Sequence, residues 1–263
     1  MNNRIVKRAL KLFLLLGGLH EVRAQQNTLG VLAGAERFSR SYDGTYAASF
    51  FYRRETSLGP LLGRWNYADR FQRTGGQLEA EWYPGIAKGM NGYLSYAYSA
   101  NSLFPSQRAG LELFQSLPRS LEGSLGGRFL IFETGNDLAI YTASMAWYVA
   151  SYYLVARVFL SPGSAGTTRA LVIQLRKYFV EPDEFVFVRV GGGISPDEQP
   201  TQSSLGSHAY NLASQSIAAG WQSGFHGDIL FEVQGIWTNQ ELISSPGDFV
   251  QSGALSAGMR FRF

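Results

Sequence analysis

The chain ends on the stretch SAGMRFRF, residues 256–263, in which side chains of two kinds alternate with a period of two. Successive side chains of an extended strand point to opposite faces. One face then carries Ala257, Met259, Phe261 and Phe263. Arg260 and Arg262 fall on the other face. The stretch therefore predicts a β-strand with one apolar face and one charged face that runs to the last residue.

The same period recurs along the chain, as in QLEAEWYP (77–84), EFVFVRV (184–190) and DILFEVQGIW (228–237). In each, apolar residues oppose charged or amide residues, and Gly, Pro, Asn, Asp or Ser clusters separate the segments. We count fourteen candidate strands, most of them near the ~9 to 11 residues that a tilted strand needs to cross a bilayer. Twelve is the alternative, if the segment 28–39 and one other do not join the wall.

The first 24 residues have the order of a secretory signal peptide, with cleavage expected before Gln25. Their apolar run, 12–19, is too short to span a bilayer. They hold five of the 23 Lys and Arg and one of the 20 Asp and Glu, which leaves 18 basic against 19 acidic residues in 25–263. This balance argues against a nucleic-acid partner, and the absence of cysteine excludes disulfides and thiolate metal sites.

The connectors between candidate strands alternate in length. The segments 99–108, 161–168, 194–209 and 239–249 are long, whereas 118–120, 180–183 and 223–227 are short. Long outer loops and short inner turns are typical of a transmembrane barrel. A soluble sandwich also alternates, but with its apolar side inward. We predict that residues 25–263 form one all-β domain, a transmembrane antiparallel up-and-down β-barrel.

Several stretches resemble the YaiO-type family of bacterial outer-membrane barrels. They include RFSRSYDGTYAASFFYR (37–53), GRWNYADRF (63–71) and the long run from Tyr93 to Phe129, and the likeness thins after 198. The resemblance implies the outer membrane of a Gram-negative bacterium, contact with its lipids and lipopolysaccharide, and insertion by the barrel-assembly machinery. The machinery would read the C-terminal face formed by Ala257, Met259, Phe261 and Phe263. The family brings no agreed activity, substrate or catalytic residue.

Charged residues on the inward register are the candidate lumen lining. They are Glu79, Glu81, Glu112, Glu122, Arg128, Arg157, Arg176 and Arg189. The acids come early in the chain and most of the arginines later, so an acidic wall would face a basic wall across the lumen. Either these charges form cross-strand networks that fill the barrel, or they line a water-filled pore and set its preference for solutes.

The inner mouth is the expected position of Arg260 and Arg262, with Glu232 and Glu36 as candidate partners. We expect a channel or porin-like conduit for small polar or charged solutes. The alternatives are a structural or adhesive surface module, and a rim enzyme that acts on lipid or lipopolysaccharide.

Catalysis at the rim would need a hydroxyl beside a base. His208 has serines nearby in sequence, and His226 lies in a short turn, but neither forms a recognisable constellation. The acidic segments SPDEQP and VEPDEF lack the spacing of a calcium loop. We therefore expect no enzymatic activity, metal or cofactor.

Overall fold

A computed structural model describes residues 27–39, 43–133, 135, 137–163, 166–179, 181, 183–195, 212–225, 228–242 and 245–263. The expected signal peptide and its cleavage site, His208 and His226 lie outside these residues. Within them, no helix is long and apolar enough to cross a membrane.

Fifteen strands form from the described residues. They are β1 (Asn27–Phe38), β2 (Thr45–Arg54), β3 (Leu61–Arg70), β4 (Arg73–Trp82), β5 (Gly85–Ala87), β6 (Met90–Tyr98), β7 (Gln107–Leu117), β8 (Leu121–Ile131), β9 (Leu138–Val149), β10 (Tyr152–Gly163), β11 (Gly166–Tyr178), β12 (Phe185–Ser195), β13 (Leu212–Phe225), β14 (Ile229–Leu242) and β15 (Ser245–Arg262).

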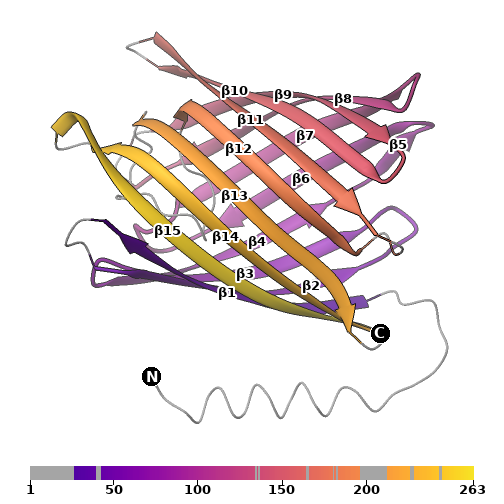
Figure 1. Cartoon of the computed structure of the whole chain (residues 1–263), viewed down its shortest axis with the longest axis horizontal. Helices are drawn as coiled ribbons and strands as arrows, with labels where there is room; N and C mark the ends of the chain where they lie inside the picture. The colour runs from indigo at the N-terminus through magenta and orange to yellow at the C-terminus, as the bar shows by residue number, and fades with distance from the viewer. Residues whose placement is uncertain are drawn as a thin grey trace.

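The strands close into an antiparallel barrel (Figure 1). β1 pairs with both β2 and β15, and β4 pairs directly with β6, while the three-residue β5 pairs only with β6. The wall therefore has fourteen strands, which confirms the predicted fold and strand number, and the alternative of twelve is wrong. β5 was not foreseen, because three residues are too few to show a period.

Two segments predicted as long connectors are largely strand. The β10–β11 ladder continues to Gly163 and Gly166, and the β14–β15 ladder continues to Leu242 and Ser245. Their Gly, Ser, Thr and Pro content suggested loops. Backbone pairing, however, needs no apolar side chain. Gly166 and Gly247 have positive φ angles, +117° and +91°, which glycine adopts readily at the ends of these hairpins.

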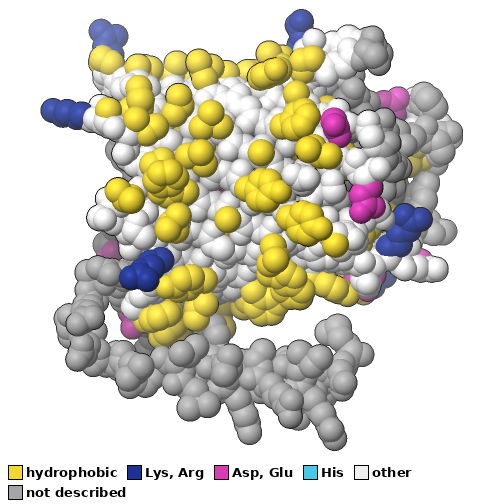
Figure 2. All heavy atoms as spheres, turned by 180° about the vertical axis from the view of Figure 1, so that it is seen from behind, with side chains coloured by type: hydrophobic (Ala, Val, Ile, Leu, Met, Phe, Trp, Pro, Cys, Tyr) yellow, Lys and Arg dark blue, Asp and Glu magenta, His cyan; other side chains and the backbone are white. Residues whose placement is uncertain are grey.

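The outer face of the wall is apolar. Its side chains include all five tryptophans, which are 36% to 47% exposed, and Leu78, Leu125 and Leu255, which are 63% to 71% exposed. Figure 2 shows hydrophobic side chains spread across the middle of the wall, with charged side chains toward its edges. A soluble sandwich would bury these residues, so the apolar face is the lipid-facing surface of a membrane barrel.

One end of the barrel, called here the terminal end, carries Asn27 and Phe263. The amide of Phe263 donates to the carbonyl of Asn27, and the amide of Asn27 to the carbonyl of Phe263, both at 3.0 Å. The β9–β10 and β11–β12 connections lie at this same end, because the strands alternate in direction around the ring.

Candidate functional site

The inner wall of the barrel carries the charged residues that the sequence singled out. Residues paired across neighbouring strands share a face. In this register all eight predicted lumen-lining residues lie on the inner face, and all except Glu122 have an exposed apolar residue beside them in sequence on the other face. Their surroundings differ, however, from one part of the wall to another.

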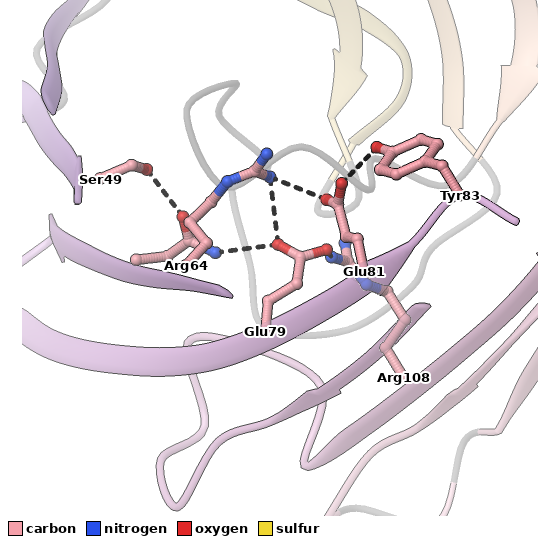
Figure 3. A network of polar contacts seen from close by, with 7 residues as sticks. Ser49, Arg64, Glu79, Glu81, Tyr83 and Arg108 are labelled. Atoms are coloured by element: carbon pink, nitrogen blue, oxygen red, sulfur yellow. Dashed lines mark hydrogen bonds and ion pairs between the residues drawn. The ribbon is translucent and has the colours of Figure 1, made fainter. Parts of the chain in front are cut away.

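On β4, Glu79 is at the centre of a hydrogen-bonded network (Figure 3). Arg64 Nη1 and Asn66 Nδ2 donate to Glu79 Oε2 at 3.2 and 3.3 Å, and Arg108 Nη2 donates to Glu79 Oε1. Ser49 Oγ extends the network to Asn66 Oδ1 at 2.7 Å. With its side chain 2% exposed, the Glu79 carboxylate is neutralised by two guanidinium groups from β3 and β7.

Glu81, two residues nearer the terminal end, belongs to the same group. Arg64 Nη1 lies 3.3 Å from Glu81 Oε1, and the hydroxyl of Tyr83 donates to Glu81 Oε2 (Figure 3). Burial, and then the adjacent Glu81 carboxylate, raise the pKa of Tyr83. The phenol therefore stays protonated and can serve as the donor.

A second network surrounds Glu112 on β7. Ser124 Oγ donates to Glu112 Oε1 at 2.5 Å, and Arg157 Nη2 reaches the same oxygen at 2.9 Å. Ser144 on β9 lies 2.5 Å from Ser124. Arg157 is on β10, so its side chain spans β8 and β9 to meet an acid three strands away.

The predicted separation into an acidic wall and a basic wall is therefore wrong for this part of the barrel. Glu79, Glu81 and Glu112 all have arginine partners within 4 Å. The physical reason is that a buried carboxylate without a compensating charge is costly. We call the inner faces of β3, β4 and β6 to β9 the paired arc.

The inner face of β10 to β12, here the open arc, is different. Along β10 and β11 half-buried inward residues alternate with exposed outward ones, and Ser161 is the one fully buried residue of these two strands. By contrast, inward Gln77, Glu79 and Glu81 of β4 are all buried. The sequences of β10, β11 and β12 contain no Asp or Glu.

Two arginines of the open arc lack an acid. Arg176 and Arg189 have no carboxylate within ion-pair distance in the part of the chain that the structure describes. The Arg176 guanidinium instead lies 4.1 Å from the ring centre of Phe185 and donates to the Tyr178 hydroxyl at 3.1 Å. Its Nε is buried without a partner. Arg189 lies 5.9 Å from the ring centre of Phe187.

Glu122 and Arg128, the remaining predicted residues, both lie on the inner face of β8 and are partly buried. No acceptor or donor contacts Glu122 among the described residues. The structure thus brings Glu79, Glu81, Glu112 and Arg157 into paired networks, and it leaves Glu122, Arg176 and Arg189 outside them.

Aromatic residues on the inner face were missed by the sequence analysis. The aromatic belt consists of Tyr148, Tyr153, Tyr178, Phe185 and Phe187. A signal was present, since EFVFVRV places Phe185 and Phe187 on the face of Arg189. The belt was overlooked because only the charged residues of the inward register had been taken as the lumen lining.

At the terminal end the inner wall encloses a cavity of about 350 Å³. Its lining includes Phe51, Arg53, Arg64, Arg260, Arg262 and Asp183. Arg260 pairs with Glu232 at 2.5 Å, which confirms one expected partner. Arg262 pairs with Asp183 of the β11–β12 connection at 2.5 Å, so the expectation of Glu36 is wrong. Glu36 lies opposite Ala254, eight residues along β15 from Arg262.

The last strand presents its apolar residues outward. Met259 and Phe261 pair with the outward residues Phe231 and Ile229 of β14, and Ala257 pairs with Val233. The rings of Phe261 and Phe263 stack with centres 5.7 Å apart. That an assembly machinery recognises this apolar face stays a prediction.

No group of three or more His, Cys, Asp or Glu side chains arranged to hold a metal ion occurs within the described ranges. The described part also contains no histidine, because all three, at 20, 208 and 226, fall outside it. The Ser/His rim site considered from the sequence is thus not tested by the structure.

Solved structures similar to this chain are outer-membrane proteins. A bacterial polysaccharide outer membrane secretin superposes with a TM-score of 0.57 at 8% identity, over 91% of this chain and 99% of the other. Omp33 of Acinetobacter baumannii gives 0.52 at 10% identity, over 92% and 100%, and OpdQ of Pseudomonas aeruginosa gives 0.51 at 8%, over 90% and 98%. At these identities the likeness is one of fold.

No curated protein matches the sequence. The family model described as the YaiO membrane beta barrel domain matches residues 26–198, about two thirds of the chain. This confirms the resemblance found in the sequence. The chain belongs to the YaiO membrane beta barrel family and is a β-barrel protein of the bacterial outer membrane.

Proposed function

We propose that this barrel is a conduit for small polar or charged solutes, with a preference for anions. The observation that carries the proposal is the open arc, where inward side chains are only half-buried and where Arg176 and Arg189 face the lumen without carboxylates. Charges that line a pore set its selectivity. Uncompensated guanidinium groups attract anions, whereas the paired arc presents a nearly neutral surface.

The proposal includes export through the signal peptide 1–24, residence in the outer membrane of a Gram-negative bacterium, and contact with its lipids and lipopolysaccharide. It includes insertion by a barrel-assembly machinery that reads Ala257, Met259, Phe261 and Phe263, so replacing Phe263 with a polar residue would impair assembly. The proposal assigns no catalytic step to His208 or His226, and no cofactor.

The test is conductance in planar bilayers. Purified protein should conduct, and in a KCl gradient the sign of the reversal potential should show anion preference. Replacing Arg176 and Arg189 together with Glu should shift the preference toward cations. Lys177→Glu is the control, because it exchanges a basic residue for an acidic one on the outward face of β11. If correctly folded protein produces no conductance in the bilayer, the proposal is wrong.

A further inference from the structure

Three rings of the aromatic belt and Arg176 form a continuous row across four strands. Tyr148 pairs with Tyr153, Tyr153 with Arg176, and Arg176 with Phe187, so these four side chains are direct neighbours on the inner face. Ring centres of Tyr148 and Tyr153 are 4.7 Å apart. Three strand spacings of about 4.8 Å give the row a length of about 14 Å. Since barrel strands are tilted, a row across them also advances along the barrel axis.

A second pair of rings lies one step nearer the terminal end. Tyr178 pairs with Phe185, with ring centres 5.8 Å apart, and Phe185 lies 6.4 Å from Phe187. All three are half-buried. Tyr148 is 43% exposed, so the row is accessible from the lumen.

A glycine on the neighbouring strand makes room for one ring. Gly220 of β13 lies opposite Phe187, and a Cβ built on Gly220 would overlap ring atoms of Phe187. One end of the Phe187 ring therefore lies over Gly220 on the inner wall.

Cationic donors adjoin the rings. The Arg176 guanidinium is held against Phe185 and the Tyr178 hydroxyl, and its buried Nε has no partner. Arg189 lies beside Phe187, one step farther from the terminal end. A guanidinium fork is the side chain best suited to a carboxylate. No carboxylate of the described chain occupies either fork.

We infer that the aromatic belt and its two arginines form a binding site for an acidic oligosaccharide. The faces of aromatic rings carry partial negative charge and attract the polarised C–H groups of a sugar ring. Tyrosine hydroxyls can bond sugar hydroxyls, and the arginines bind the carboxylate. A row of about 14 Å accommodates more than one sugar ring.

This inference rests on the proposed conduit, because it names the solute class that the lumen holds. The test measures binding by isothermal titration calorimetry, with the mature chain in detergent micelles. Trigalacturonate should bind, maltotriose of similar size should bind at least about tenfold more weakly since it lacks carboxylates, and benzoate should bind weakly since it offers one ring and no hydroxyls. Equal binding of maltotriose, or tighter binding of benzoate, would overturn the assignment.

Variants separate the two parts of the site. Phe187→Leu keeps an apolar side chain but removes the ring face, and Arg176→Gln removes the fork; each should weaken trigalacturonate binding by about tenfold. Phe231→Leu and Lys177→Gln are the matched controls on the outward face, and they should leave binding unchanged. Site variants that bind like the parent would reject the site.

Conductance separates this inference from the proposed function. A barrel that conducts KCl but binds no trigalacturonate refutes the saccharide site and leaves the conduit standing. A barrel that binds trigalacturonate, with loss in the two site variants, but does not conduct refutes the conduit and keeps the site. Block of the KCl current by trigalacturonate, relieved in Phe187→Leu, would support both.

Discussion

The paired arc and the open arc are built by the same alternation of residues, yet the charged side chains of the two arcs have opposite surroundings. In the paired arc Glu79 and Glu112 are nearly inaccessible, and each meets arginine from another strand. In the open arc Arg176 and Arg189 lie against aromatic rings and meet no acid among the described residues. The difference follows from where the acids fall in the sequence, since β10 to β12 contain none. The ion pairs of the paired arc therefore stabilise the barrel, whereas the arginines of the open arc are available to solutes.

The largest effect should come from breaking the paired arc at Glu79. Glu79→Ala leaves Arg108 without this partner carboxylate and Arg64 with Glu81 alone, so we expect a loss of about 3–5 kcal/mol in the free energy of unfolding. Urea unfolding in lipid vesicles measures it. Glu55→Ala is the control, because the Arg53–Glu55 pair is nearly half-exposed and should contribute less than about 1 kcal/mol. Equal losses in both variants would contradict a special role for the buried network.

A smaller effect is expected at Gly220, beneath the open arc. Gly220→Val places a side chain where the Phe187 ring lies, and such overpacking costs about 1–3 kcal/mol. The ring would be displaced from its position over residue 220, so trigalacturonate binding should fall together with stability. Gly235→Val on β14 is a suitable control, because a Cβ there meets only a carbonyl oxygen at 3.9 Å. Undiminished binding by Gly220→Val would show that the pose of the ring is irrelevant.

The ion pair at the mouth should contribute less. Asp183 is half-exposed, and Arg262 is 25% exposed. Arg262→Ala should therefore change the free energy of unfolding by about 1 kcal/mol or less. Its clearer result should be a larger single-channel conductance, because the β11–β12 connection would no longer be held to β15. A conductance equal to that of the parent would show that this connection does not limit the current.

Removing an arginine of the open arc should affect stability least. Arg189→Ala breaks no ion pair within the described chain, so we expect a change within about 0.5 kcal/mol in the free energy of unfolding. The same change should lower anion selectivity in the bilayer. A loss as large as that of Glu79→Ala would erase the distinction between the two arcs.

Much of the fold could be predicted from the sequence, because a two-residue period fixes both the strand and its faces. The inward position of Glu79 and Arg189 and the outward position of Trp65 and Trp237 followed from that period. The partners did not follow. Arg157 meets Glu112 across two intervening strands, and that contact depends on barrel curvature and side-chain reach, which no local pattern records.

The site was predictable in part. The charged residues were found by their register, but the division into a paired and an open arc depends on which charges meet in space. The hairpin ends near Gly166 and Gly247 were taken for loops, because turn-forming residues can also lie in strands that extend beyond the membrane. Phe185 and Phe187 were visible in the pattern and needed only to be read as lumen residues.

The contact between Arg262 and Asp183 also bears on the order of events during assembly. Asp183 belongs to the β11–β12 connection, whereas Arg262 is the last residue of the strand that closes the ring. The two can meet only after β15 has joined the sheet beside β14, since the ladders of β12, β13, β14 and β15 connect them. The β11–β12 connection is therefore fastened to β15 late in assembly, when this last strand has been added.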